Sequence, residues 1–293
     1  MHKAGFVNIV GNPNVGKSTL MNQLVGEKLS IATFKAQTTR HRIMGIVNTD
    51  DAQIVFSDTP GVLKPNYKMQ EMMLQFSESA LADADILLYV TDVVENPEKN
   101  MDFLDKVSKM TIPVILLINK IDESDQKKLG NLVETWHKLL PNAEILPLSA
   151  KNKFGIDILM KRILELLPES PAFFDKDQLT DKPAKFFVSE IIREKILRYY
   201  DKEIPYSVEV VVESFKEDDR QIHINAVIYV ERNSQKGIII GHQGMALKKV
   251  STEARKSLER FFDKKIFLET FVKVDKDWRN SQKELKHFGY NPE

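Results

Sequence analysis

The hydrophobic residues of the first 167 positions form short apolar runs separated by longer amphipathic stretches. This alternation predicts a mostly parallel sheet whose strands are joined by helices. The apolar runs predict six strands, at Phe6–Val10, Arg42–Asn48, Gln53–Asp58, Asp85–Asp92, Pro113–Asn119 and Glu144–Ser149. The amphipathic stretches predict helices at Lys17–Gly26, Tyr67–Ala82, Pro97–Met110, Asp125–Leu139 and Gly155–Leu167. Because the loop between the second and third strands is too short for a crossover, we expect an antiparallel hairpin there.

The pattern changes near residue 168. The segment Pro168–Pro183 is rich in proline and acidic residues and follows neither hydrophobic period, so it is interpreted as a linker. From Lys185 the order becomes helix, two strands, helical turn, the loop GHQG, a long helix over 245–263 and a last strand over 265–274. The fold class predicted is α/β, a six-stranded sheet with helices on both faces, followed by an α+β domain. Expected boundaries are 1–170, a linker over 171–184, 185–275, and a tail over 276–293.

Composition narrows the function classes. The 293 residues suffice for two domains, and the 42 basic residues balance the 42 acidic ones, so any nucleic-acid contact must come from locally clustered charge. The absence of cysteine excludes disulfides, thiolate nucleophiles and cysteine-ligated zinc. No apolar run approaches the roughly 20 residues of a membrane-spanning helix, and the N-terminus has the pattern of a strand rather than a signal peptide. A cytoplasmic protein is therefore expected.

The segment GNPNVGKS, Gly11 to Ser18, matches GxxxxGK[ST] and lies between the first predicted strand and the first predicted helix. Its glycines let the backbone wrap around phosphate, and the N–H groups of the helix N-terminus point at the negative charge. In such a loop Lys17 reaches the β- and γ-phosphates and the Ser18 hydroxyl ligates magnesium. We predict a nucleotide phosphate site; the alternative is a surface turn that matches the pattern by chance.

Two further segments suit a nucleotide-sensing role. The sequence DTPG, Asp58 to Gly61, ends the third strand, where the carboxylate can hold magnesium and the Gly61 N–H can meet the γ-phosphate. Between the two motifs lies the polar stretch KAQTTRHR, in which Thr38 or Thr39 could close over magnesium. We favour Thr39, and the alternative is a plain solvent-exposed connection.

The sequence NKID, Asn119 to Asp122, follows an apolar strand and favours guanine over adenine. A carboxylate at Asp122 can accept from both N1–H and the exocyclic amine of guanine, whereas adenine would leave that acceptor unpaired. The next strand ends in SAK, Ser149 to Lys151, where the Ala150 N–H can donate to the guanine carbonyl oxygen. Four motifs thus occur in order, each at a strand end.

Residues 4–167 resemble a translation-factor-class G domain of the Ras-like P-loop type. The resemblance and the motifs together predict that GTP contacts Gly11, Asn12, Asn14, Val15, Gly16, Lys17, Ser18, Thr19, Asp58, Gly61, Asn119, Lys120, Asp122, Ser149, Ala150 and Lys151. They predict that Lys17, Thr39, Gly61 and Asn14 act in hydrolysis and that Ser18, Thr39 and Asp58 ligate Mg²⁺.

One position departs from the Ras-like pattern. Val62 replaces the glutamine that orients the attacking water, so slow intrinsic hydrolysis is expected. In related families an asparagine at the position of Asn14 helps to bind K⁺, and we expect K⁺ to stimulate hydrolysis here.

The C-terminal region contains GHQG, Gly241 to Gly244, before a long amphipathic helix. This loop and the order of elements around it resemble a type II KH domain, which binds unstacked RNA. Contacts are predicted from Gly241, His242, Gln243, Gly244, Ile239, Ile240, Lys248 and Lys249. The isoleucines also suit a core position, and the lysines also suit a solvated face. Because His242 and Gln243 stand where many KH loops carry basic residues, weak phosphate attraction is expected.

A G domain followed by a type II KH domain resembles the Era family, within the TrmE–Era–EngA-like GTPases. The resemblance implies a monomeric GTPase that binds the 3′ end of small-subunit ribosomal RNA, acts in maturation of the small ribosomal subunit, and contacts the inner face of the cell membrane peripherally. It also implies that nucleotide state changes how the KH domain packs on the G domain. Two other functions stay open: a scaffold that binds GTP without hydrolysing it, and an ATP-driven RNA remodelling enzyme, which Asp122 opposes.

Overall fold

The computed structural model describes residues 2–291, which form two compact units. The first unit comprises residues up to 66 together with 70–181, and the second comprises 67–69 and 182–291. None of the helices within the described residues combines the length and apolar character that a membrane crossing requires.

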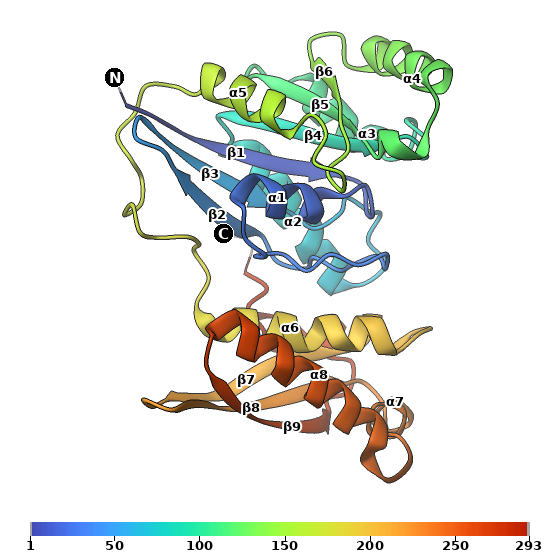
Figure 1. Ribbon diagram of the computed structural model, residues 1–293. Helices are drawn as coiled ribbons and strands as arrows, with labels where there is room; N and C mark the ends of the chain where they lie inside the picture. Colours follow the sequence, from blue (N-terminus) through green and yellow to red (C-terminus); the bar gives the residue numbers. More distant parts are fainter. Residues whose placement is uncertain (1, 292–293) are drawn as a thin grey trace. The chain divides into compact units, whose positions relative to one another are not determined.

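The first unit contains a six-stranded sheet in the order β2-β3-β1-β4-β5-β6 (Figure 1). Only β2 is antiparallel to its neighbour, β3, as the short predicted hairpin requires. The strands are β1 (Lys3–Gly11), β2 (Ile43–Asn48), β3 (Ala52–Asp58), β4 (Ile86–Asp92), β5 (Val114–Asn119) and β6 (Glu144–Pro147).

Helices cover both faces of this sheet (Figure 1). The face formed by Val10, Tyr89 and Leu116 packs against buried residues of the second, third and fourth helices. The helices are α1 (Lys17–Val25), α2 (Lys68–Ala82), α3 (Met101–Ser108), α4 (Gln126–Leu139) and α5 (Ile156–Leu166). Since the central strands are parallel, their carboxyl ends meet at one edge of the sheet, where the predicted motifs lie.

Residues 171–181, predicted to belong to a linker, pack on the first unit along the edge strand β2. The N–H of Ile46 donates to the carbonyl oxygen of Leu179 at 2.8 Å, and Gly45 forms a bridge with Thr180. The Gln53 side chain accepts from the N–H groups of Phe173 and Phe174. This segment therefore satisfies backbone groups of the sheet edge that solvent would otherwise bind.

The second unit is an α+β layer with a three-stranded sheet in the order β7-β8-β9. Strand β8 pairs with β7 in antiparallel and with β9 in parallel orientation. Buried residues of the helices and of the sheet, such as Ile192, Ile224 and Val250, form one core. The elements are α6 (Ala184–Tyr199), β7 (Glu209–Glu217), β8 (Gln221–Val230), α7 (Asn233–Ile240), α8 (Met245–Phe262), β9 (Lys265–Val274) and α9 (Gln282–His287). The last helix belongs to the tail whose structure the sequence pattern did not predict.

Candidate nucleotide and RNA sites

The loop between β1 and α1 wraps around the Lys17 side chain. Lys17 Nζ donates to the carbonyl oxygens of Gly11 at 3.0 Å and Asn12 at 2.8 Å. A Cβ on Gly11 would lie 2.1 Å from the carbonyl oxygen of Val90, and one on Gly16 would lie 2.2 Å from Asn119 Nδ2. Both positions therefore require glycine, and the N-terminus of α1 faces the space enclosed by the loop.

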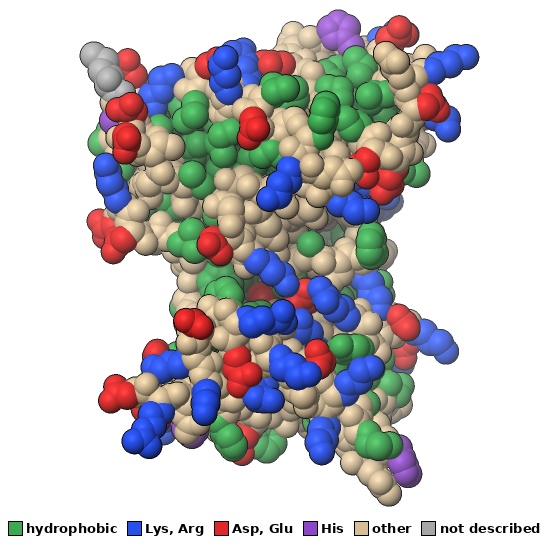
Figure 2. All heavy atoms as spheres, in the orientation of Figure 1, with side chains coloured by type: hydrophobic (Ala, Val, Ile, Leu, Met, Phe, Trp, Pro, Cys, Tyr) green, Lys and Arg blue, Asp and Glu red, His purple; other side chains and the backbone are tan. Residues whose placement is uncertain are grey.

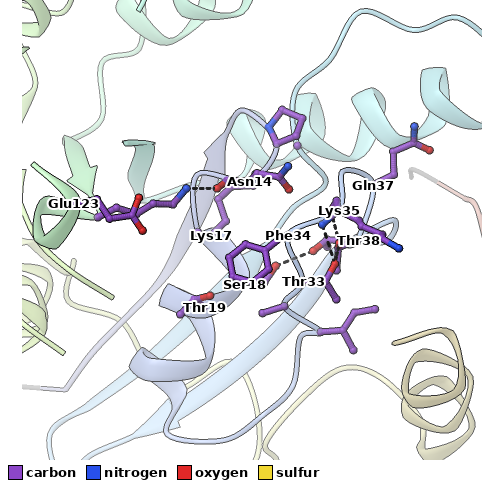
Figure 3. A pocket seen from close by; sticks show the side chains of 17 residues that line it. Asn14, Lys17, Ser18, Thr19, Thr33, Phe34, Lys35, Gln37, Thr38 and Glu123 are labelled. Atoms are coloured by element: carbon purple, nitrogen blue, oxygen red, sulfur yellow. Dashed lines mark hydrogen bonds between the residues drawn. The ribbon is translucent and has the colours of Figure 1, made fainter. Parts of the chain in front are cut away.

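A cavity of about 320 Å³ opens beside this loop. Figure 3 shows Asn14, Lys17, Ser18 and Thr19 on one side of it, while Thr33, Phe34, Lys35 and Thr38 reach it from the segment before β2. Lysine, hydroxyl and backbone N–H groups line the cavity, so its chemistry suits an anionic ligand.

Ser18 and Thr39, which line the cavity, meet the buried Asp58 behind it. Ser18 Oγ lies 2.8 Å from Thr39 Oγ1 and donates to Asp58 Oδ2 at 2.7 Å. Asp58 is fully buried, and its Oδ1 has no hydrogen-bond partner within residues 2–291. Two hydroxyls and a carboxylate with an unpaired oxygen form a donor set that a hard divalent cation such as Mg²⁺ accepts. The residues present therefore fit the predicted Mg²⁺.

Burial shifts the pKa values of the two charged groups of this site, Asp58 and Lys17, in opposite directions. It raises the pKa of the Asp58 carboxyl, although the Lys17 charge and the hydroxyls of Ser18, Ser30 and Thr39 oppose the rise. It lowers the pKa of the Lys17 ammonium to about 8, although Asp58 and Glu95 oppose the fall. Both charged forms lack solvation, and phosphate and a cation are the ligands that would compensate them.

The two candidate threonines lie in different environments. Thr39 Oγ1 faces Ser18 and Asp58, whereas Thr38 Oγ1 donates to the carbonyl oxygen of Lys35 at 2.6 Å and lies 2.7 Å from Thr33 Oγ1. Thr38 is thus turned into its own loop. The geometry therefore favours Thr39 as the residue near the cation.

The residues of NKID and SAK form hydrogen bonds with one another at the ends of β5 and β6. Asn119 Nδ2 donates to the carbonyl oxygen of Val15 at 2.8 Å, and Asn119 Oδ1 accepts from the Ala150 N–H at 3.0 Å. Ser149 Oγ donates to Asp122 Oδ1 at 2.6 Å. These contacts bring Asp122, which is exposed, together with Ala150 beside the phosphate loop.

The start of the segment after β3 packs closely on the phosphate loop. A Cβ on Gly61 would lie 2.7 Å from Pro13 Cα, so no side chain fits there. Val62 is 3 % exposed within the core, and its N–H donates to the carbonyl oxygen of Gly11 at 3.0 Å. The Val62 side chain therefore points away from the cavity.

In the second unit, the loop GHQG connects α7 to α8. Gly241, Gln243 and Gly244 all have positive φ angles, of 72°, 51° and 74°. His242 and Gln243 are exposed, and a Cβ on Gly244 would meet nothing within 4 Å. A Cβ on Gly241, by contrast, would lie 2.6 Å from Ala246 Cβ, so the part of the loop that is open to a ligand is residues 242–244.

Two family models match the chain. Residues 6–120 match the 50S ribosome-binding GTPase family, and residues 203–279 match the KH domain. GTPase Era of Clostridium kluyveri is 44% identical over 99% of this chain and 100% of its own length. GTPase Era of Ruminiclostridium cellulolyticum is 43% identical over 99% of this chain and 98% of its own length. The chain belongs to the Era family of GTPases.

Two solved Era structures have the same fold over nearly the whole chain. A crystal structure of Era in complex with MgGDPNP and nucleotides 1506–1542 of 16S ribosomal RNA is 38% identical, with a TM-score of 0.95 and 99% of each chain covered. A variant of Aquifex aeolicus Era bound to GDP·AlF4⁻ is 38% identical, with a TM-score of 0.94, 98% of this chain and 99% of that chain covered. The predicted G domain and KH domain are confirmed.

Within this Era-family chain, one predicted RNA contact needs correction. Ile239 is fully buried in the core of the second unit, so its side chain cannot line an RNA surface. Ile240 is partly buried against the same core, whereas Ile238, which was not predicted, is 49 % exposed. The helical period of α7 decides this, because consecutive residues of a helix point in different directions.

Lysine and arginine side chains gather over the α6 and α8 face of the second unit (Figure 2). Lys248 and Lys249 are exposed there, and Lys249 Nζ lies 4.3 Å from the centre of the Tyr199 ring. Arg255 and Lys256 form ion pairs with acidic residues of their own helix. The KH domain of this Era-family chain thus carries positive charge near its GxxG loop that is only partly neutralised locally.

Sequence reasoning missed several residues that support the nucleotide site. Asp92 Oδ2 accepts from Lys120 Nζ at 2.6 Å, and the same ammonium donates to the carbonyl oxygen of Asn14. Asp92 ends a buried strand, which is a signal that could have identified it. Asn100 contacts both Asn12 and Val62, but nothing in its sequence context distinguishes it from other loop asparagines.

Proposed function

We propose that this Era-family protein is a GTP-hydrolysing switch that binds small-subunit ribosomal RNA through its KH domain and acts in biogenesis of the small ribosomal subunit. One observation carries the nucleotide part of the proposal: the buried Asp58 carboxylate accepts from the Ser18 and Thr39 hydroxyls through Oδ2 and keeps Oδ1 without a hydrogen-bond partner, next to a lysine-containing phosphate loop. GTP and GDP would be substrate and product.

Each part of the site has a separate task. Lys17 and the N–H groups at the start of α1 hold the phosphates, and the Gly61 N–H meets the γ-phosphate. Ser18, Thr39 and Asp58 would hold Mg²⁺, which supplies charge neutralisation of the phosphate oxygens. Because Val62 is buried in the core, it cannot orient water, so hydrolysis depends on positioned charge and is slow without a stimulator.

Guanine selection is assigned to Asp122, which Ser149 orients through a hydrogen bond. We expect calorimetry in Mg²⁺ to show binding of GTP and GDP but not of ATP. Asp122→Asn should shift the preference toward xanthosine nucleotides, because the amide presents a donor in place of an acceptor. An unchanged nucleotide preference in this variant would instead support the ATP-driven alternative.

The RNA part rests on the open GxxG loop, the lysines near it and the relatives. The Era of the crystal structure with a TM-score of 0.95 is in complex with nucleotides 1506–1542 of 16S ribosomal RNA. We assign the corresponding role to Gly241–Gly244 and Lys248 of this chain. Crosslinking in cells followed by sequencing should recover the 3′ end of small-subunit ribosomal RNA, and recovery of unrelated RNA would refute the assignment.

Regulation by potassium and coupling to RNA complete the proposal. Asn14 is exposed in the phosphate loop, and K⁺ bound there would stimulate hydrolysis; equal single-turnover rates in K⁺ and Na⁺ would remove this role.

Nucleotide binding and RNA binding are linked if the GTP and GDP forms bind RNA with different affinities. The ratio of these two RNA affinities must then equal the factor by which bound RNA changes the ratio of GTP affinity to GDP affinity. A scaffold that does not hydrolyse GTP would show no turnover with or without RNA.

Cytoplasmic location follows from this assignment to ribosomal RNA. A monomeric state and peripheral contact with the inner face of the cell membrane stay predictions of the family resemblance. A flotation assay with vesicles of bacterial lipid composition tests the membrane contact directly.

A further inference from the structure

Asn100, in the loop between β4 and α3, contacts two parts of the nucleotide site that are far apart in sequence. Its Nδ2 donates to Asn12 Oδ1 at 2.5 Å and to the carbonyl oxygen of Val62 at 3.1 Å. Asn12 belongs to the phosphate loop, and Val62 follows the γ-phosphate-sensing Gly61. A single side-chain amide therefore joins these two segments.

Val62 is held at three points. Its side chain is buried in the core, its N–H donates to the carbonyl oxygen of Gly11, and its carbonyl oxygen accepts from Asn100. The first two contacts come from the fold of the strand and loop. The third contact depends on the Asn100 side chain alone, so it is the one that a substitution can remove selectively.

The backbone of Asn100 shows that its amide is not used for helix capping. Asn100 occupies the N-cap position of α3 in the left-handed region, with φ of 61° and ψ of 45°, and makes no side-chain cap hydrogen bond. Asparagine, aspartate and glycine are the residues that tolerate this conformation. The amide is directed at the phosphate loop instead of the first turn of its helix.

Asn12 is itself fixed on its other side. It forms a side-chain hydrogen bond with Glu95, which also accepts from Thr91 Oγ1 at 2.8 Å. If the Asn12 amide turned over, its oxygen would face the Glu95 carboxyl group that it now meets as a donor. The contact with Glu95 therefore orients Asn12 so that its oxygen faces Asn100.

We propose that Asn100 is a positioning residue for GTP hydrolysis, which holds the Gly61–Val62 segment on the phosphate loop through its two hydrogen bonds. The proposal rests on the GTPase function proposed above. Preorganised donors stabilise a transition state because they need not be reordered during the reaction. With Val62 secured, the neighbouring Gly61 N–H is already placed for the γ-phosphate, whereas binding of GDP, which lacks this group, does not use that placement.

Two substitutions separate this role from a structural one. Asn100→Gly keeps the left-handed backbone and removes the amide with both of its hydrogen bonds, and we expect kcat to fall at least about fivefold, the loss expected for one such bond. Asn100→Asp is isosteric but sets a carboxylate against the oxygens of Asn12 and Val62, so kcat should fall by about tenfold or more. Aspartate also tolerates the left-handed backbone at this position, so the start of α3 should keep its conformation.

The matched control is Asn96→Ala in the same loop. Asn96 Oδ1 accepts from the Glu98 N–H, so this substitution changes the loop without touching Asn12 or Val62 through that contact. Single-turnover hydrolysis, the affinity for mant-GDP and hydrogen exchange of the Val62 amide are measured for all four proteins. Support requires slower hydrolysis and faster exchange at Val62 in both Asn100 variants, with mant-GDP affinity kept within about twofold of wild type.

Three outcomes overturn the proposal. Unchanged kcat and exchange in Asn100→Asp would show that the amide positions nothing. A parallel loss of mant-GDP affinity would show that Asn100 merely maintains the phosphate loop. An equal loss of kcat in Asn96→Ala would assign the effect to the loop as a whole. Absence of hydrolysis by the wild-type protein refutes the proposed function instead, while the exchange measurement still tests the contact.

Discussion

The molecule contains two glycine-flanked loops that precede a helix, and their surroundings differ. In the phosphate loop, a Cβ on Gly11 or Gly16 would collide with Val90 or Asn119. In the GxxG loop, a Cβ on Gly244 would meet no atom within 4 Å, although its φ of 74° still favours glycine. All four glycines have positive φ angles, and a Cβ on Gly241 would also lie 2.6 Å from Ala246 Cβ. Gly244 is therefore the position where the backbone conformation alone requires glycine, whereas at the two glycines of the phosphate loop surrounding protein atoms exclude a side chain as well.

The difference extends to charge. Lys17 is buried inside the phosphate loop, whereas His242 and Gln243 of the GxxG loop are exposed. A buried, preorganised site loses little entropy when it binds, while an exposed loop must compete with water for each phosphate. Substitutions in the two loops should therefore act in different ways. In the phosphate loop they add collisions or remove charge, and in the GxxG loop they add backbone strain or change the exposed charge.

The largest effect is expected for Gly16→Ala. Its Cβ would meet the Asn119 side chain, which holds the base-binding loop, so nucleotide affinity should fall by about a hundredfold or more. A mant-GDP fluorescence titration measures this. Gly26→Ala is the control, because Gly26 has a comparable φ of 82° but open space around its Cβ position. Equal affinities of the two variants would show that the collision has no role.

Thr39→Ala should have the next largest effect, about tenfold to a hundredfold on kcat in Mg²⁺, because it removes a hydroxyl that faces Ser18 and Asp58. Thr38→Ala is the matched variant and should cost much less, since its hydroxyl bonds within its own loop. Single-turnover hydrolysis over a Mg²⁺ titration compares them. A larger defect in Thr38→Ala would reverse the assignment.

A smaller effect is expected when both exposed residues of the GxxG loop become acidic. His242→Asp with Gln243→Asp should lower affinity for a fragment of the 3′ end of small-subunit ribosomal RNA by about tenfold through repulsion of phosphate. Aspartate tolerates the positive φ of Gln243, so the loop should keep its shape. The reverse variant, with lysine at both positions, should bind more tightly. Identical affinities of the two variants at low salt would exclude phosphate contact at this loop.

The smallest effect is expected for Gly244→Ala. With open space around the Cβ position, only backbone strain is added, and the free energy of unfolding of the second unit should fall by about 1 kcal/mol. Urea denaturation monitored by the fluorescence of Trp278, which is buried in that unit, reports it in a Trp136→Phe background, because Trp136 is buried in the first unit. A loss of unfolding free energy several times larger would show that the space around the Gly244 Cβ position is filled and not open.

Local patterns predicted the strands and helices well because strands buried on both faces, such as β3 and β4, are continuous apolar runs, whereas helices buried on one face are amphipathic. The predicted strand Gln53–Asp58 lies within β3, and the predicted helix Asp125–Leu139 differs from α4 by one residue at its start. The motif residues could be placed at strand ends for the same reason. Since parallel strands share one edge, sequence alone brought Ser18, Asp58 and Asn119 to one site.

Contacts between distant segments were beyond the sequence pattern. Residues 171–181 have the composition of a free linker, yet Gln53 and Ile46 bind them to the sheet edge. Ile239 lies next to the GxxG loop in sequence, but the turn of α7 directs it into the core. Asn100 shows no sequence signal because its partners Asn12 and Val62 are each more than 30 residues away.

The sequence by itself determined the order of elements, the phosphate and guanine motifs and the two-domain plan. These features are encoded by residues close together in the chain or by hydrophobic period. Only the tertiary structure decided which threonine faces Asp58, that Val62 is buried, and that Asn100 joins the phosphate loop to the segment after β3. The physical reason is that hydrogen bonds between loops depend on where their strands end in space, and loop residues carry no period from which that placement can be calculated.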